Sequence, residues 1–226
     1  MKKAYFITGT DTNVGKTLIA SALLRAFVSR GFRAVGMKPV AAGCEETTGG
    51  LRCADVESLR AAGNNVAAPP ELVNPYALVL PVAPHIAAER AGVEIGIGTV
   101  LDAFRRLQAM SDVVVVEGVG GFMVPLNRRE DTADMAQRLG VPVILVVGMR
   151  LGCLNHALLS AQVMKQRGLR LAGWVANQIE PGMPFLRENV AALEHGLQAP
   201  LLGEVPYQEG LSADEVAGLL RMALLD

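Results

Sequence analysis

The residues best suited to chemistry form a glycine-containing loop near the start of the chain, Gly9-Thr10-Asp11-Thr12-Asn13-Val14-Gly15-Lys16-Thr17. An apolar run over 5–8 precedes the loop and an amphipathic run over 16–30 follows it, a pattern that predicts a strand, a phosphate-binding loop and a helix. Backbone N–H groups at such a helix start face a phosphate, Lys16 supplies a charge for its oxygens, and the Thr17 hydroxyl can hold Mg²⁺. The first glycine lies one residue earlier than the usual spacing requires, so this is a variant nucleotide-binding loop.

Three further residues could complete this site. The apolar run 112–117 ends in Glu117 and continues as Gly118-Val119-Gly120-Gly121. A carboxylate at the carboxyl end of a strand beside a phosphate loop is a typical second magnesium ligand, although Asp is more usual than Glu. Lys38 ends the run 34–38, but a single strand-end lysine is more often a solvated charge. Asp55 can equally be a helix-start residue stabilised by the dipole, so local pattern decides neither role.

Composition predicts one globular domain over 1–226. Hydrophobic residues make up 51% of the 226 residues and charged residues 19%, and the formal net charge is −1. We therefore expect small-molecule partners, with no nucleic acid and no membrane. No apolar run reaches the roughly 18 residues of a membrane span and no cleavable segment precedes the first strand, which predicts a cytoplasmic protein. Cys44, Cys53 and Cys153 form no Cys-x-x-Cys pair, so we expect reduced thiols.

The elements that must position these residues alternate between apolar and amphipathic runs, as in a mostly parallel sheet with helices on both faces. Strands are expected at 5–8, 34–38, 112–117, 143–147, 171–176 and 201–205. Helices are expected at 16–30, 54–62, 100–110, 132–139, 155–166 and 187–195, with a last one beginning at Ser212, whose capping box includes Glu215. The stretch 68–84 holds five prolines and is predicted to be an ordered loop without helix. The fold class is therefore α/β, a single-domain P-loop NTPase.

Several blocks of the sequence, in order, resemble the dethiobiotin synthetase family. The blocks are Gly-Thr-Asp-Thr-x-Val-Gly-Lys-Thr (9–17), Lys-Pro-Val-Ala-x-Gly (38–43), Asp55, Asn-Pro-Tyr (74–76), Pro-His (84–85), Glu-Gly-x-Gly-Gly (117–121), Gly-Cys-Leu-Asn-His (152–156) and Trp-Val-Ala-Asn (174–177). The resemblance implies an ATP-dependent ligase of biotin biosynthesis. In that family 7,8-diaminopelargonate is carboxylated by CO₂ to a carbamate, which takes the γ-phosphoryl group of ATP and closes to the ureido ring of dethiobiotin, leaving ADP and phosphate.

The resemblance also assigns roles to individual residues. Magnesium would be held by Thr17, Asp55 and Glu117. The nucleotide would contact Asn13, Val14, Gly15, Lys16, Thr17, Leu18, Gly118, Val119 and Gly120 through its phosphates, and Asn177, Gln178, Pro206 and Tyr207 near its adenine. Thr12, Lys16 and Lys38 would gather as catalytic groups around the carbamate and the transferring phosphoryl group, where cations offset the repulsion of two anions.

Enzymes of the family are homodimers, so the resemblance implies that the turn containing Gly152 and Asn155 contacts a substrate near the subunit interface. Two positions depart from the family: Asn13 replaces a frequent Glu, and Ala42 replaces a Ser that contacts substrate. The lost hydroxyl removes one hydrogen bond, typically about 0.5–1.5 kcal/mol. The three histidines, His85, His156 and His195, lack metal-ligand spacing, and the two that fall in family blocks, His85 and His156, are predicted to be structural.

Three other classes remain open on the sequence. A partition or cell-division ATPase switch would carry a signature lysine where this chain has Asp11, and often a basic membrane tail, whereas residues 212–226 carry three acidic residues and one basic residue. A GTPase would carry Asn-Lys-x-Asp where this chain has Asn177-Gln178-Ile179-Glu180. A related ligase acting on another carboxylate is disfavoured by the block that begins at Lys38.

Overall fold

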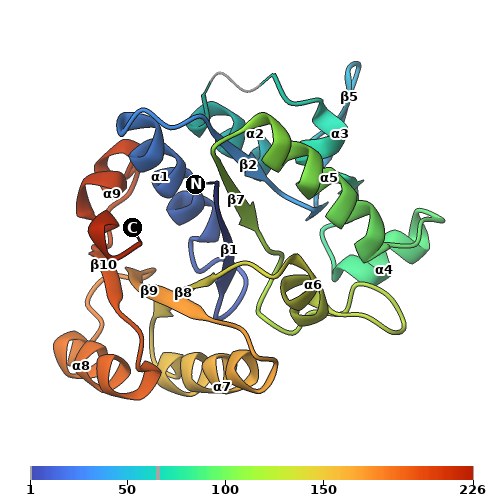
Figure 1. Cartoon of the computed structure of the whole chain (residues 1–226). Helices are drawn as coiled ribbons and strands as arrows, with labels where there is room; N and C mark the ends of the chain where they lie inside the picture. Colours follow the sequence, from blue (N-terminus) through green and yellow to red (C-terminus); the bar gives the residue numbers. More distant parts are fainter. Residues whose placement is uncertain (1, 65–66, 226) are drawn as a thin grey trace.

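The computed structural model describes residues 2–64 and 67–225, so Met1, Asn65, Val66 and Asp226 of the expected domain 1–226 lie outside the described part (Figure 1). Its centre is a six-stranded sheet with the order β10-β9-β8-β1-β7-β2. Every neighbouring pair in this sheet is parallel. The strands are β1 (Lys3–Gly9), β2 (Ala34–Met37), β7 (Val113–Glu117), β8 (Val143–Met149), β9 (Leu171–Gln178) and β10 (Leu201–Val205). All six predicted strands are confirmed.

Helices cover both faces of the sheet because its strands are apolar on both sides. All residues of β7 and β8 are buried. One core joins the sheet to α1 (Lys16–Ser29), α2 (Ala54–Ala62) and α9 (Ala213–Leu219). The other core joins it to α5 (Ile97–Met110), α6 (Thr132–Leu139), α7 (Cys153–Gln166) and α8 (Leu186–Leu197). The predicted fold class is confirmed, and this burial leaves only the strand ends free to face a ligand.

The predicted helices are present, with ends that differ by a few residues. The largest difference is α5, which begins at Ile97, three residues before the predicted start. The predicted capping box at Ser212 is confirmed, with Glu215 as its partner. A short 3₁₀ helix, η1 (Met222–Leu225), was not predicted. In the described part of the chain, no helix is both long enough and apolar enough to span a bilayer.

The prediction that residues 68–84 contain no helix is wrong. This stretch forms α3 (Pro70–Val73) and β6 (Tyr76–Leu78), and its last proline begins α4 (Pro84–Arg90). Both helices start with proline in their first turn, where the missing N–H has no intrahelical partner to lose. Strand β6 pairs in parallel with β3 (Val40–Ala42), so the stretch builds a second small sheet rather than a loop.

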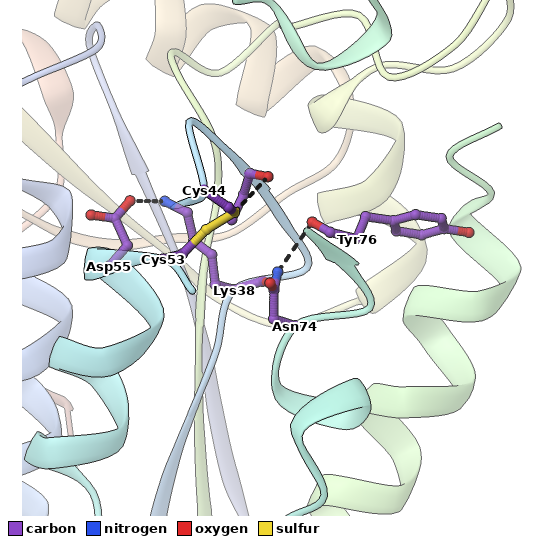
Figure 2. Close-up of a disulfide and its surroundings, with 7 residues drawn as sticks. Lys38, Cys44, Cys53, Asp55, Asn74 and Tyr76 are labelled. Atoms are coloured by element: carbon purple, nitrogen blue, oxygen red, sulfur yellow. Dashed lines mark hydrogen bonds and ion pairs between the residues drawn. A yellow bond between two sulfur atoms is a disulfide. The ribbon is translucent and has the colours of Figure 1, made fainter. Parts of the chain in front are cut away.

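The prediction that all three cysteines are reduced is wrong for two of them. Cys44 and Cys53 form a disulfide, whereas Cys153 is free and buried (Figure 2). The two cysteines flank an antiparallel hairpin of β4 (Glu45–Thr47) and β5 (Gly50–Arg52), in which Glu45 pairs with Arg52. Because of that register Cys44 and Cys53 lie opposite each other, with their Cα atoms 4.5 Å apart. The pairing depends on the hairpin, which the spacing of the cysteines alone does not reveal.

Candidate active site

The carboxyl ends of β1, β7 and β2 meet at one edge of the sheet, where the chain forms a cavity of about 940 Å³. Its lining brings together most of the predicted phosphate, metal and substrate residues. From the predicted set it contains Thr12, Asn13, Gly15, Lys16, Thr17, Lys38, Ala42, Asp55, Glu117, Val119 and Gly120. These residues come from four separate parts of the sequence, so the edge of the sheet assembles them.

The phosphate-binding loop follows β1 and ends where α1 begins at Lys16. Two residues of the loop have a left-handed backbone, Asn13 with φ 60° and Gly15 with φ 89°. Asparagine tolerates this conformation better than most residues, and glycine adopts it without cost. At Gly15 a side chain would also overlap the Asn177 amide, so glycine is required there for space as well as for conformation.

Lys16 is buried at the mouth of the loop, and its Nζ donates to the carbonyl oxygen of Asp11 at 2.7 Å. Burial, together with the nearby charge of Lys38, lowers the pKa of Lys16 to about 8. A lysine held this way is ready to exchange a backbone carbonyl for a phosphate oxygen, whose negative charge would favour the charged form of the lysine.

A four-residue cluster lies beside the loop. Lys38, one residue beyond β2, places its Nζ 2.6 Å from Glu117 Oε1 and 2.9 Å from Asp55 Oδ2. The Thr17 hydroxyl donates to the same Glu117 oxygen at 2.8 Å. Figure 2 shows the Lys38 ammonium pointing at the Asp55 carboxylate, beside the disulfide. Parallel pairing of Met37 with Val116 puts the ends of β2 and β7 side by side, which explains how residues 79 apart in sequence touch.

Burial and charge act against each other in this cluster. Burial alone would lower the pKa of Lys38, but Glu117 and Asp55 outweigh it and raise the pKa. Burial would raise the pKa of Asp55, but Lys38 and Thr17 lower it below its usual value. For Glu117 burial prevails, and its pKa is raised despite Lys38. The raised pKa of Lys38 favours a proton on the lysine, whereas the raised pKa of Glu117 favours a proton on the carboxylate. The 2.6 Å contact and the second carboxylate on Lys38 support a cationic lysine.

The donor set of this cluster fits a magnesium ion. Two carboxylates and a hydroxyl are hard oxygen ligands of the kind that Mg²⁺ prefers. Glu117 Oε2 is buried and has no hydrogen-bond partner among the described residues, and such an oxygen is costly unless a cation or donor reaches it. No group of three His, Cys, Asp or Glu side chains suited to a metal occurs in the part of the chain that the structure describes, so the Thr17 hydroxyl is needed to complete this set.

A second cavity of about 200 Å³ lies on the other side of the loop. It contains Asn13, Gly15, Leu18, Asn177, Gln178, Pro206 and Tyr207 from the predicted nucleotide set. The Asn177 Nδ2 group donates to the Val14 carbonyl at 2.8 Å, which ties the end of β9 to the loop. The amide oxygen of Asn177 is not used in that bond and remains available as an acceptor.

Comparison with known proteins places the chain in a family. A model of the AAA domain family matches residues 3–215. The ATP-dependent dethiobiotin synthetase of Nitrosospira multiformis is 53% identical over 223 residues, which cover 99% of this chain and 96% of that protein. The chain belongs to the dethiobiotin synthetase family.

Solved structures with low identity share the fold of this family member. The septum site-determining protein MinD of Pyrococcus horikoshii, solved with Mg-ADP, has a TM-score of 0.59 at 14% identity, covering 99% of this chain and 89% of that one. Chloroplast FtsY of Physcomitrella patens has a TM-score of 0.54 at 19% identity, and the chain spans 65% of its length. At these identities the likeness concerns architecture alone.

Some residues predicted from the family blocks lie outside both cavities. The Val14 side chain is buried and packs beneath the loop, which leaves its backbone to face a ligand. Gly118 lies directly after β7, where a Cβ would contact Phe6. Gly152 is the N-cap of α7, and Asn155 lines a separate surface cavity between α7 and α8. A single chain therefore does not bring Gly152 and Asn155 to the proposed substrate.

Other residues at the site were missed by the sequence reasoning. The segment Pro81-Val82-Ala83-Pro84 lines the larger cavity; it belongs to the proline-rich stretch 68–84, and its last residue to the family block Pro-His, but no single residue in it was assigned a role. Asn74 donates to the Lys38 carbonyl at 2.6 Å and so holds the strand end that carries this lysine. Arg150, directly after β8, contacts Asp11 of the loop with Nη2 2.5 Å from Oδ2, and no local pattern marks it.

Proposed function

We propose that this protein converts 7,8-diaminopelargonate, CO₂ and ATP to dethiobiotin, ADP and phosphate, as an ATP-dependent ligase of biotin biosynthesis. The observation that carries this proposal is the 53% identity to a dethiobiotin synthetase over 99% of the chain. The cavity supports it, because it joins a phosphate-binding loop to a second lysine, Lys38, in a space large enough for two substrates.

The chain's own residues would act mainly by placing charge. The Lys16 ammonium and the backbone of residues 13–18 would hold the triphosphate, and Lys38 would face the carbamate oxygen that attacks the γ-phosphate. The Thr12 hydroxyl, in the same cavity, would donate to one of these anions. Lys38 is unsuited to act as a base, because the two carboxylates raise its pKa. Its contribution would therefore be electrostatic, greatest where charge develops in the transition state.

Magnesium would be held by Thr17, Asp55 and Glu117, the residues with the contacts described above. When bound, the ion would supply positive charge to the β- and γ-phosphates. Lys38 contacts two of these residues, Asp55 and Glu117. Binding the ion would leave the Lys38 ammonium with fewer anionic partners and so free it for the carbamate.

The smaller cavity would take adenine. Asn177 Oδ1 would accept from the adenine amino group, while its Nδ2 keeps its bond to Val14. Gln178, Pro206 and Tyr207 would complete the walls around the base. Ala42 lines the larger cavity without a hydroxyl, so substrate binding there relies on the other walls.

The substrate residues Gly152 and Asn155 imply a second copy of the chain. They lie away from the chain's own cavity, so they would reach only a substrate bound to a partner subunit, and we propose a homodimer on that ground. We also propose a cytoplasmic location, where ATP and the diamine are available.

One assay tests the proposed reaction. ADP release should require both the diamine and a source of CO₂, and dethiobiotin should form in equal amount to ADP. Omitting the diamine, bicarbonate or Mg²⁺ one at a time provides the controls. Strong ATP turnover without the diamine would contradict the ligase and favour a switch ATPase of the kind that shares the fold.

A further inference from the structure

Asp11 poses an electrostatic problem in the proposed site. It lines the larger cavity, which must accept a triphosphate and a carbamate, and a carboxylate there repels both. Its place in the loop has a structural reason, because Oδ1 accepts from the backbone N–H of Thr12 at 2.7 Å and its carbonyl accepts from Lys16. The loop therefore needs the hydrogen bonds of Asp11, whereas the negative charge of its carboxylate would weaken the binding of phosphates.

The side chains that line the cavity carry one more negative charge than positive charge, so a cation from outside the lining is needed to balance them. Its lining contains two lysines, Lys16 and Lys38, and three carboxylates, Asp11, Asp55 and Glu117. Lys38 contacts Asp55 and Glu117, and Lys16 contacts the carbonyl of Asp11 rather than its carboxylate. The cation on the Asp11 carboxylate is Arg150, at 2.5 Å.

Arg150 is placed for this contact by the central sheet. It follows β8, the strand that pairs with β1 on the side opposite β7. The same strand end holds the loop twice more, through Thr10 N–H to the Val146 carbonyl at 3.0 Å and Gly148 N–H to the Thr10 hydroxyl at 3.3 Å. These hydrogen bonds fix the end of β8 beside the first residues of the loop, and so they fix the position from which Arg150 contacts Asp11.

We propose that Arg150 is a positioning residue for the nucleotide: by neutralising Asp11 and holding its carboxylate away from the incoming phosphates, it permits an acidic residue to shape an anion-binding loop. This rests on the proposed function of the site. An alternative is an exposed salt bridge without consequence, since both side chains are partly exposed, 39% for Arg150 and 45% for Asp11. The two interpretations predict different nucleotide affinities for a variant in which both charges are removed.

A double-mutant cycle separates these readings. The variants are Arg150→Ala, Asp11→Asn and the two combined, with Arg150→Lys as the charge-conserving replacement. Asparagine keeps the Oδ1 acceptor for Thr12 while removing the negative charge. The matched control is Arg105→Ala, which breaks the exposed Arg105–Asp102 pair on α5. KM for ATP and kcat are measured with diamine and bicarbonate saturating, and Kd is measured with a non-hydrolysable ATP analogue and Mg²⁺.

We expect Arg150→Ala to raise KM and Kd for the nucleotide about tenfold, the effect of one unbalanced charge near a half-exposed phosphate site. The increase should shrink at high salt, and kcat should change less than KM. Adding Asp11→Asn to Arg150→Ala should bring both constants back to within about threefold of the parent, and Arg150→Lys should keep most of the affinity. Arg105→Ala should change neither constant.

Two results would overturn the proposal: Arg150→Ala within twofold of the parent, or a double variant no better than Arg150→Ala alone. The second result would assign Arg150 a role in loop structure that charge does not explain. Failure of the parent enzyme to form dethiobiotin would instead contradict the proposed function. The analogue-binding cycle would still test the Arg150–Asp11 pair in that case, so the two failures are distinguishable.

Discussion

Two regions line the same cavity and are built by different means. The phosphate side, residues 9–17 with the end of β7, is a continuous loop between a buried strand and a buried helix. The outer segment, residues 40–84, contains two small two-stranded sheets and short helices, and the Cys44–Cys53 disulfide closes one of its hairpins. The first is positioned by its neighbours in sequence and in the sheet, whereas the second depends on contacts between short elements, one of them covalent.

This difference assigns different tasks to the two sides. The phosphate side has a backbone fixed by left-handed residues and strand contacts, as suits a site for a common ligand. The outer segment supplies Asp55 and Ala42, which line the cavity and belong to the proposed metal and substrate sites. Lys38 lies at the junction, since it follows β2 and contacts residues from both sides. Substitution of Lys38 should therefore lower activity most, and a substitution in one region should leave the task of the other region largely unchanged.

The largest effect is expected for Lys38→Ala. Loss of the cation that we propose to act mainly in the transition state should lower kcat by about 10²–10³. Lys38→Gln should restore only part, because it lacks the charge. Since the change also leaves the buried Glu117 carboxylate without its ion pair, turnover should be expressed per ATP-binding site, counted by nucleotide titration. Turnover within about threefold of the parent would make Lys38 an ordinary structural lysine.

A smaller effect is expected for Glu117→Gln. Replacing a proposed magnesium ligand by a neutral amide should raise the Mg²⁺ concentration for half-maximal activity by about 10–100-fold, with the chain still folded. The measurement is a Mg²⁺ titration of turnover beside a thermal unfolding curve. Glu204→Gln, an exposed acid on β10, is the matched control and should leave the titration unchanged. An unchanged Mg²⁺ requirement in Glu117→Gln would remove this residue from the proposed metal site.

The pH dependence of nucleotide binding tests the phosphate side alone. The pKa of Lys16 is about 8, so its charge is present below pH 8 and is lost as the pH rises above it. Affinity for ATP should therefore fall by up to about fivefold between pH 8 and pH 9. The measurement is the Kd of an ATP analogue across this range in the parent and in Lys16→Gln, which should bind weakly without this dependence. A flat profile in the parent would show that Lys16 is not the group that titrates.

The smallest effect on activity is expected for the disulfide, which tests the outer segment alone. Cys44→Ser with Cys53→Ser, or treatment of the parent with a thiol reductant, should lower the free energy of unfolding by about 2–4 kcal/mol. Because Asp55 lies two residues after Cys53, the Mg²⁺ requirement should rise a few-fold, while nucleotide affinity stays within about twofold. The double serine variant is also the control, since reductant should not affect it further. A loss of nucleotide affinity would show that the two sides are not separable.

The sequence by itself determined the elements whose signals are local. The apolar runs give the six strands of the central sheet, and the glycine loop between a strand and a helix gives the phosphate side. The family blocks selected Lys38 and Asp55, which local pattern left undecided. Periodicity and loop chemistry are set by neighbours within a few residues, so they can be read without the fold.

Only the tertiary structure decided the contacts between distant segments. The Lys38–Glu117 ion pair requires β2 to lie beside β7, and the Arg150–Asp11 pair requires β8 to lie beside β1. The disulfide depends on the register of a hairpin whose residues are all exposed and carry no apolar pattern. The short elements between 68 and 84 likewise form against β3 and β2 rather than from their own preferences. Strand order and register bring these side chains together, and neither is encoded in the residues next to them.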